Sequence, residues 1–285
     1  MRLNEAVKRG VYAQKLLLTN LGVLRFSHSS RFELAKKLAA TLGGKRLLDY
    51  GCGDGTFLGS NVGSFERGVG VEIDHLLVNE NAQRFSAEPT IGFQHTSDIV
   101  KEPNESFDTI FCMEVLEHIA PENLDGILSL LHRLLAKDGT LVVSVPIEVG
   151  PSILAKQAYR AYAGRNIVDY QHRERYTVRE MVKSVLARAT TTLDRPVYRV
   201  EFSDGSPNVH CGHKGFNWRA LRERLAQRLE VRETQFSPLP YVGSLINSQA
   251  WFLCSRRPGD EAQVQPRRTG SDTPSYEERQ KTSLQ

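Results

Sequence analysis

The sequence predicts an α/β domain whose sheet is mostly parallel and is covered by helices on both faces. Short apolar runs of strand length alternate with segments in which apolar residues recur at helical spacing. A glycine-rich turn follows the first of these runs. Strands that alternate with helices in this way are typical of a doubly wound parallel sheet. The chain of 285 residues, 40% hydrophobic and 25% charged, is able to fill such a core.

The expected elements begin with a helical extension at the N-terminus. Residues 1–43 are amphipathic, and Gly43 and Gly44 end the helical pattern. Five strands are then expected, at residues 46–50, 68–73, 91–96, 107–113 and 140–145. A helix at 124–135 lies between the last two, and the Lys-Asp-Gly sequence at 137–139 is expected to close it.

The pattern changes after residue 148. Residues 148–215 contain two helical stretches and a polar segment with no clear parallel strand, so we expect an inserted cap region within a domain spanning 44–255. Three further elements complete the expected domain: a helix at 217–229 and strands at 231–236 and 248–255. The tail, 256–285, is polar and rich in Pro, Ser and Thr, and is expected to be disordered.

Charge and cysteine content limit the function classes. The formal charge of +4 is modest, and basic and acidic residues alternate along the chain, which disfavours a nucleic-acid partner. The four cysteines form no CxxC pair, so reduced cytosolic thiols are expected in place of disulfides or a zinc site. No secretory signal and no apolar run near the ~20 residues of a membrane span is found. A cytoplasmic protein without a transmembrane segment is predicted, and its oligomeric state stays open.

The most informative segment runs from Asp49 to Thr56 and has the sequence DYGCGDGT. An apolar strand leads into a turn with glycine at every second position. There the backbone turns sharply and approaches a ligand where a Cβ would collide. In open α/β sheets this place, beyond the carboxyl end of the first strand, binds ligands. Dinucleotide-binding proteins have a glycine-rich turn too, so the turn alone leaves the ligand undecided.

Three side chains bear on the choice of ligand. Asp49 precedes the turn, where a carboxylate repels a pyrophosphate but attracts an ammonium group. Thr56 stands where the dinucleotide motif has a third Gly or Ala. Glu72 ends the second strand, where it can accept both ribose hydroxyls, and this would suit NAD equally well. Asp49 and Thr56 therefore favour a cationic ligand, although Asp49 could also be a turn residue and Glu72 an ordinary strand-end carboxylate.

In these motifs the chain resembles the class I S-adenosylmethionine-dependent methyltransferases, especially the small-molecule branch that includes quinone-biosynthesis O-methyltransferases. The segment 49–55 looks like that family's cofactor loop, and 70–74 (GVEID) is similar to its second motif, with Glu72 as the ribose-binding acid. Asp98 falls where the family has an acidic residue near the adenine amine. The segments 106–119 and 137–146 resemble its fourth and fifth strands with the loop between them.

The resemblance covers about residues 30–147 and implies a Rossmann-like fold with S-adenosylmethionine as cofactor. The residues expected to bind this cofactor are Asp49, Gly51, Cys52, Gly53, Gly55, Glu72, Ile73, Asp98, Ile99, Met113 and Glu114. Glu114 could instead cap the next helix.

Methyl transfer from a sulfonium is an in-line displacement that requires the nucleophile and the methyl group to lie ~3–3.5 Å apart. A hydroxyl nucleophile must also lose its proton, usually to a histidine. His118, at the end of the loop after the fourth strand, is the first candidate, and His172 and His213, in polar segments before helices, are the others. Each could instead be a structural or solvated histidine. His210, Cys211 and His213 lack a second pair at zinc spacing, so no metal is expected.

The acceptor is expected to be a small molecule or a lipid- or glycan-linked group, methylated on oxygen. Residues 112–115 replace the Asn/Asp-Pro-Pro-aromatic turn typical of enzymes that methylate base or amide nitrogens, and no basic, aromatic-interleaved patch for RNA is found. Two alternatives stay open. One is an NAD-dependent oxidoreductase, and the other is a catalytically inactive cofactor-binding domain with a regulatory role.

Overall fold

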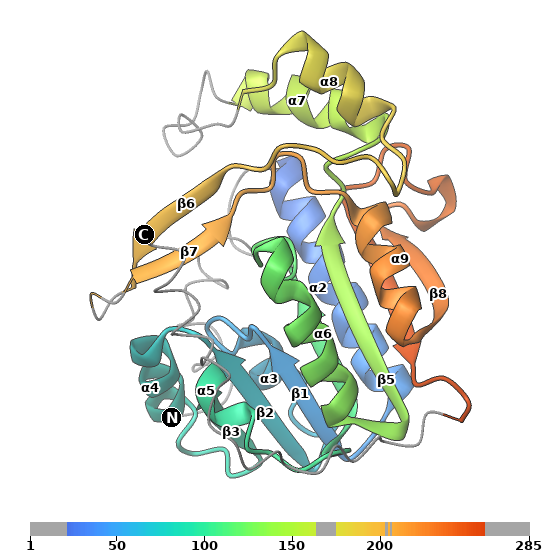
Figure 1. Cartoon of the computed structure of the whole chain (residues 1–285). Helices are drawn as coiled ribbons and strands as arrows, with labels where there is room; N and C mark the ends of the chain where they lie inside the picture. Colours follow the sequence, from blue (N-terminus) through green and yellow to red (C-terminus); the bar gives the residue numbers. More distant parts are fainter. Residues whose placement is uncertain (1–21, 164–174, 203–204, 206, 260–285) are drawn as a thin grey trace, which may run out of the picture.

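The computed structural model of the chain describes residues 22–163, 175–202, 205 and 207–259. Its centre is a seven-stranded sheet in the order β3-β2-β1-β4-β5-β9-β8 (Figure 1). The first five in chain order are parallel to one another: β1 (Arg46–Tyr50), β2 (Arg67–Glu72), β3 (Ile91–His95), β4 (Phe107–Met113) and β5 (Leu135–Pro146). Two antiparallel strands complete the sheet, β8 (Glu230–Ser237) and β9 (Gln249–Ser255). The predicted fold class is confirmed.

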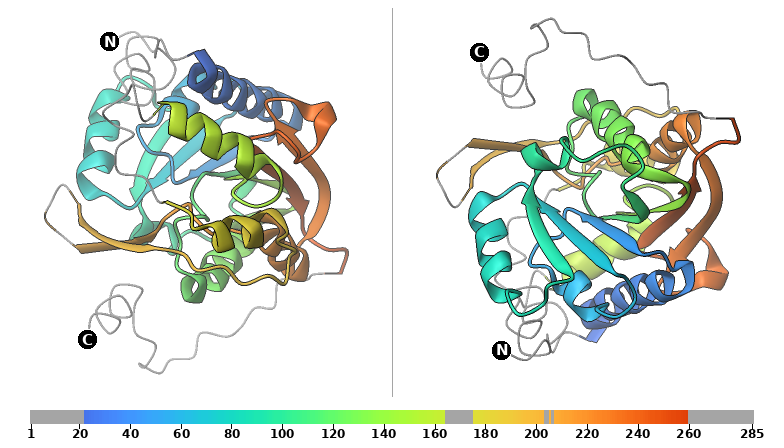
Figure 2. Two further views of the ribbon diagram at one scale, coloured as in Figure 1. Left: turned by 90° about the horizontal axis from the view of Figure 1, so that it is seen from above. Right: turned by 90° about the horizontal axis from the view of Figure 1, so that it is seen from below.

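Helices cover both faces of this sheet (Figure 2). On one face lie α2 (Gly22–Leu42) and α3 (Thr56–Ser60), and on the other α6 (Pro121–Leu134) and α9 (Trp218–Arg228). Two apolar clusters correspond to these faces, one including Leu38 of α2 and the other Leu128 of α6. The helices on both faces explain why β1, β4 and β9 are buried along almost their whole length.

The strand order positions the functional residues. Because β1 lies between β2 and β4, the order reverses at β1, and the segments that follow these strands meet at one edge of the sheet. The helix α4 (His75–Arg84) follows β2, and the short α5 (Thr96–Ile99) follows β3. The glycine turn after β1 therefore lies beside the ends of β2 and β4.

The helix before β5 starts and ends earlier in the chain than expected. It starts with Pro121 at its first turn and ends at Leu134. Residues 137–139, which were expected to close this helix, already belong to β5, because Leu135 pairs with Phe107 of β4. The backbone N–H of Glu105 also bonds the carbonyl of Arg133. Pairing with β4 offers these residues backbone partners that a longer helix would forgo.

The region expected as an inserted cap lies at the end of the sheet toward which β5 points (Figure 1). It contains α7 (Ser152–Ala163), α8 (Val178–Val185) and an antiparallel ribbon of β6 (Val197–Glu201) and β7 (Pro207–Cys211). The ribbon was not predicted. Every residue of β6 is exposed, so the strand has no buried face, and it is only five residues long.

Strand β9 lies between β5 and β8 and is buried along its whole length. Among the described residues, no helix combines the length and apolar character that a bilayer span requires. All four cysteines are free and buried. The structure of residues 1–21 and of the tail beyond 259 lies outside the described part, so the helical character expected at the start and the disorder expected at the end stay predictions.

Candidate functional site

The glycine turn after β1 has the backbone that its sequence predicts. Gly51, Gly53 and Gly55 all have positive φ, at 81°, 52° and 68°. A Cβ on Gly51 would overlap the Cγ2 methyl of Val115, in the loop after β4, whereas a Cβ on Gly53 would meet nothing within 4 Å. Gly51 is therefore fixed by close packing, and Gly53 leaves open space above the turn.

Two carboxylates flank this turn. Glu72, at the end of β2, accepts hydrogen bonds from the backbone N–H of Gly53 at 2.9 Å and of Ile73 at 2.8 Å. Asp49, at the end of β1, is only 2% exposed. Burial, together with the charges of Glu72 and Asp54, raises the pKa of Asp49 to about 8. A buried carboxyl of this kind gains from a nearby cationic group, because such a group would stabilise its ionised form.

Helix α4 supports the turn through two residues that the sequence did not indicate. The side-chain amide of Asn81 donates to the carbonyl of Gly53 at 2.7 Å, and Arg84 donates to the carbonyl of Asp54. Arg84 also bonds the Asn81 Oδ1 at 2.7 Å. Asn81 is completely buried, which is unusual for an asparagine in a polar helix. In the sequence, the role of Asn81 is signalled only by a polar residue on the face of α4 that packs against the protein.

Cys52 and Ile99 have side chains buried in the protein interior. The Cys52 Sγ lies 3.7 Å from the carbonyl of Gly53, and burial raises the pKa of this thiol far above its ordinary value. Ile99 is fully buried in the main apolar cluster. Contact of either residue with a ligand would therefore have to involve the backbone.

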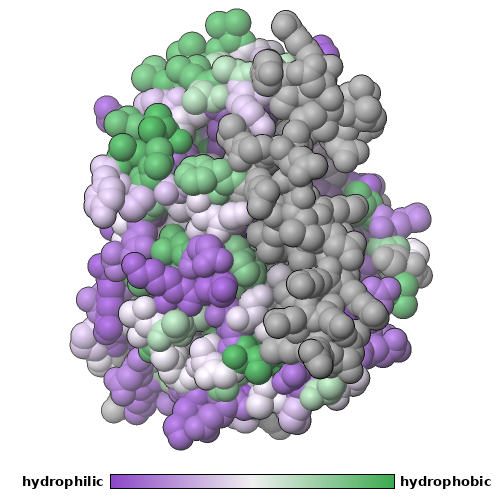
Figure 3. Space-filling model, turned by 180° about the vertical axis from the view of Figure 1, so that it is seen from behind, coloured by the Kyte–Doolittle hydropathy of each residue, from purple (hydrophilic) through white to green (hydrophobic). Residues whose placement is uncertain are grey.

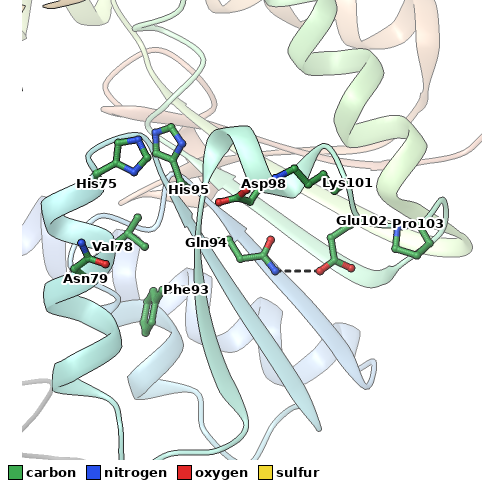
Figure 4. Close-up of a pocket in the computed structure, with 10 residues that line it drawn as sticks. All are labelled: His75, Val78, Asn79, Phe93, Gln94, His95, Asp98, Lys101, Glu102 and Pro103. Atoms are coloured by element: carbon green, nitrogen blue, oxygen red, sulfur yellow. Dashed lines mark hydrogen bonds and ion pairs between the residues drawn. The ribbon is translucent and has the colours of Figure 1, made fainter. Parts of the chain in front are cut away.

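Asp98 lies in the short helix α5, at the outer edge of the sheet. Its carboxylate bonds Lys101 at 2.7 Å and is half-exposed. It lines a surface hollow of about 610 Å³ between α4, β3 and α5 (Figure 4). His75 and His95 stack at one side of this hollow, with ring centroids 3.6 Å apart. None of the other predicted site residues lines it.

Glu114 follows β4 and has a left-handed backbone, with φ at 56°. Its carboxylate pairs with Arg31 of α2 at 3.0 Å and accepts a hydrogen bond from Ser144 Oγ at 3.2 Å. The alternative that Glu114 caps the next helix is wrong, because α6 begins at Pro121. Met113, just before it, is partly buried against the cluster beneath α2 and α3. The N-terminal helix thus reaches the edge of the site through Arg31.

A second group of polar side chains lies where the loop after β4 meets the cap. The Nε2 atoms of His118 and His213 are 3.2 Å apart, although 95 residues separate them in the chain. His118 Nδ1 lies 3.1 Å from the carbonyl oxygen of Cys211, and the N–H of Cys211 donates to the carbonyl of His118. Glu117, fully buried, has its Oε1 3.8 Å from His118 Nε2. We call Glu117, His118 and His213 the histidine cluster.

Burial governs the charges of this cluster. It lowers the pKa of His213 to about 4, with His118 adding to the effect, and it lowers the pKa of His118. It raises the pKa of Glu117 well above its ordinary value. The imidazoles are consequently uncharged at neutral pH. The third predicted histidine, His172, lies outside the described residues.

The two parts of the site are neighbours. Val115, which packs against Gly51, is three residues before His118 in the same loop. A ligand held at the glycine turn would therefore lie near the loop that carries Glu117 and His118 of the histidine cluster. The acidic side chains of Asp49 and Glu72 on one side can bind a cationic ligand, and the uncharged imidazoles on the other can act on a nearby nucleophile.

Comparison with known proteins places these features in a family. A family model described as "Methyltransferase domain" matches residues 26–188, more than half of the chain. A ubiquinone biosynthesis O-methyltransferase of Glaesserella parasuis serovar 5 (strain SH0165) is 37% identical over 110 residues, which are 35% of this chain and 45% of that protein. An enzyme of the same name from Rhodopseudomonas palustris (strain TIE-1) is 29% identical over 133 residues, 44% of this chain and 49% of that protein. The chain spans about half the length of these curated relatives.

Solved structures share the fold at low sequence identity. A protein from Pyrococcus horikoshii OT3 superposes with a TM-score of 0.53 and 16% identity, covering 86% of this chain and 98% of that chain. The N-methyltransferase NodS from Bradyrhizobium japonicum WM9, in complex with S-adenosyl-L-homocysteine, gives a TM-score of 0.51 and 13% identity over 90% of this chain and 97% of that one. These similarities establish the fold.

Proposed function

The chain belongs to the methyltransferase-domain family and is a class I S-adenosylmethionine-dependent methyltransferase, and from this premise we propose that it methylates a hydroxyl oxygen. The observation that carries the proposal is the 3.2 Å contact between His118 and His213 in the histidine cluster, close to the glycine turn. A hydroxyl nucleophile must lose its proton. Uncharged imidazoles provide for this, either by accepting the proton or by binding a cation that promotes its loss.

We propose that S-adenosylmethionine is held by the glycine turn and the residues around it. The donor carries an ammonium group, which suits the buried carboxyl of Asp49. Open space above Gly53 leaves room for the ligand, and the oxygens of Glu72 have lone pairs left to accept ribose hydroxyls. Asp98, further along the sheet edge, would face the adenine amine. When bound, the cofactor supplies a methyl group that is already activated for displacement.

The acceptor is a small molecule or a lipid- or glycan-linked group, with the cap, residues 148–215, as part of its pocket. The curated relatives are named O-methyltransferases of ubiquinone biosynthesis, which supports oxygen as the methylated atom. Apolar surface gathers at the cap end of the molecule (Figure 3). Exposed apolar side chains near this end include Val178, Val182, Leu186, Tyr241, Leu245 and Ile246. Such a surface favours an acceptor with an apolar portion.

The sequence left two other functions open. The family assignment removes the NAD-dependent oxidoreductase. The inactive regulatory domain is disfavoured by the place of His118, three residues from the side chain that packs on Gly51. We further propose that the protein is cytoplasmic, which its four free cysteines support.

Two measurements test this function in sequence. Thermal unfolding with S-adenosylmethionine, S-adenosylhomocysteine or NADH identifies the cofactor, because a ligand at a hundred times its dissociation constant adds about 2.7 kcal/mol of stability. Tritium transfer from labelled S-adenosylmethionine to catechols and long-chain quinols, with the matching anilines as controls, then identifies the acceptor atom. Stabilisation by the first two ligands and labelling of the hydroxyl series are expected. Labelling of the anilines alone would overturn oxygen as the methylated atom.

A further inference from the structure

The histidine cluster contains a buried carboxylate whose hydrogen-bonding capacity is unused. Neither side-chain oxygen of Glu117 has a hydrogen-bond partner among the described residues, and the residue is fully buried. An unsatisfied buried carboxyl costs free energy, so a group of this kind calls for a partner. The nearby Arg195 donates to the backbone carbonyl of Glu117, not to its carboxylate.

The two imidazoles present a second unusual contact. His118 Nδ1 lies at hydrogen-bond distance from the carbonyl of Cys211, which can only accept, so this nitrogen carries the proton. His118 Nε2 is then unprotonated, and its lone pair faces His213 Nε2, 3.2 Å away. A proton on His213 Nε2 would satisfy that contact but would leave Glu117 unpaired. A cation between the three side chains satisfies all of them.

We propose that Glu117, His118 and His213 bind a divalent transition-metal cation such as Zn²⁺. One ligand atom from each of the three residues lies within 4.8 Å of the others. Ligands of tetrahedral zinc at ~2.0–2.1 Å from the metal are about 3.3 Å apart. The observed separations from His118 Nε2 are 3.2 Å to His213 Nε2 and 3.8 Å to Glu117 Oε1, so a small adjustment of side chains completes the geometry.

The surroundings fit a metal site that is open to a further ligand. Two imidazoles and one carboxylate are a donor set that first-row transition metals accept, and three protein ligands leave a position for water or substrate. The carbonyl of Cys211 orients His118 as carbonyls commonly orient metal-binding histidines. A metal site was not predicted from the sequence because only the chain neighbours of His213 were considered as further ligands. Its proposed partners lie in the loop after β4, and His118 is 95 residues earlier.

The proposed role of the cation rests on the proposed function, whereas its binding does not. A hydroxyl oxygen in the open position would lose its proton to solvent more readily. That oxygen then attacks the methyl carbon, the carbon–sulfur bond breaks, and its electron pair stays on sulfur as S-adenosylhomocysteine forms. The products are the methyl ether, S-adenosylhomocysteine and one proton. In this scheme the histidines hold the metal and do not themselves take the proton.

Metal binding is tested on the full chain, with any affinity tag removed and after treatment with a chelator. Isothermal titration with Zn²⁺ and the visible spectrum with Co²⁺ are compared for the wild type, Glu117→Gln, His213→Ala and His210→Ala. The last is the matched control, because the His210 ring lies beside His118, 5.8 Å between centroids, outside the ligand set. One ion per chain is expected for the wild type and for His210→Ala. Affinity at least ~10-fold weaker is expected for the two ligand variants.

Equal affinity in all four proteins, or no binding by the wild type, would overturn the metal site. Stabilisation of each variant by S-adenosylhomocysteine shows that the variants are folded. Methyl transfer to hydroxyls at the same rate by chelator-treated and zinc-loaded protein would overturn the catalytic role and leave the proposed function standing. Specific zinc binding without methylation of any hydroxyl would leave the metal site standing while the proposed function fails.

Discussion

The glycine turn and the histidine cluster lie in adjoining parts of the site, yet they are built in opposite ways. The turn comes from one short stretch of chain and is shaped by backbone conformation. It accepts a hydrogen bond from Asn81 of α4 and donates one to Glu72 of β2. The cluster consists of side chains from two distant segments, joined where the cap meets the loop after β4. A contiguous site can be recognised from spacing alone, whereas a site made by a tertiary contact requires the fold.

The difference predicts that chemistry and cofactor binding can be separated by mutation. Replacing His118 by alanine is expected to reduce the rate of methyl transfer about 10²- to 10⁴-fold, because it removes a proposed ligand of the cation that promotes loss of the acceptor's proton. The dissociation constant for S-adenosylmethionine is expected to change little. Tritium transfer and isothermal titration measure the two quantities, and His210→Ala is the control. An equal loss in both would mean that the cluster belongs to the cofactor-binding part.

The packing of the turn can be tested with a pair of glycines. Gly51→Ala is expected to lower the free energy of unfolding by about 2–4 kcal/mol, because a Cβ there meets Val115 in addition to the strain of a positive φ. Gly53→Ala, with open space around it, is expected to cost only about 1 kcal/mol from φ. Urea unfolding compares the two variants. Equal destabilisation would show that close packing of the loop after β4 on the turn is unimportant.

Asp49 allows the charge in the turn to be removed with little change of shape. Asp49→Asn is expected to weaken S-adenosylmethionine binding about 10- to 100-fold, because a charge-assisted hydrogen bond to the ammonium group is lost. Methyl transfer at saturating cofactor should fall much less, since the histidine cluster is intact. Isothermal titration gives the affinity and steady-state kinetics give the rate. Unchanged affinity would remove Asp49 from the cofactor site.

The same variant is expected to be more stable than the wild type at alkaline pH. Burial raises the pKa of Asp49 from 3.8 to about 8, so between these values the folded state binds a proton that the unfolded state has released. Stability of the wild type consequently falls as pH rises from about 4 to about 8, and this contribution is absent from Asp49→Asn. The variant's melting temperature should exceed that of the wild type by a few degrees at pH 8.5 and by little at pH 4.5. A constant difference across this range would contradict the raised pKa.

The sequence predicted most of the fold because the strands are apolar and the helices periodic. The prediction failed for elements that lack such an apolar or periodic pattern. Strand β6 is short and has no buried face. The start of β5 at Leu135 depends on pairing with Phe107, which no local pattern records.

For the site, spacing identified the turn and Glu72, and both histidines of the cluster were named as separate candidates. Their contact, and the proximity of Glu117, could not be predicted, because 95 residues separate His118 from His213 and leave no local spacing to recognise. Arg31 and Asn81 were missed for the same reason. Each reaches the site from a helix through tertiary contacts.

The position of β9 has a consequence for how the protein is made. The strand that pairs with β5 on one side and β8 on the other is the last element of the sheet in the chain. The parallel half of the sheet and the cap are synthesised before residues 249–255. Until then β5 presents an unpaired apolar edge, the kind of surface on which nascent chains aggregate. A chaperone that binds the nascent chain at this stage would meet a sheet that is still open beside β5.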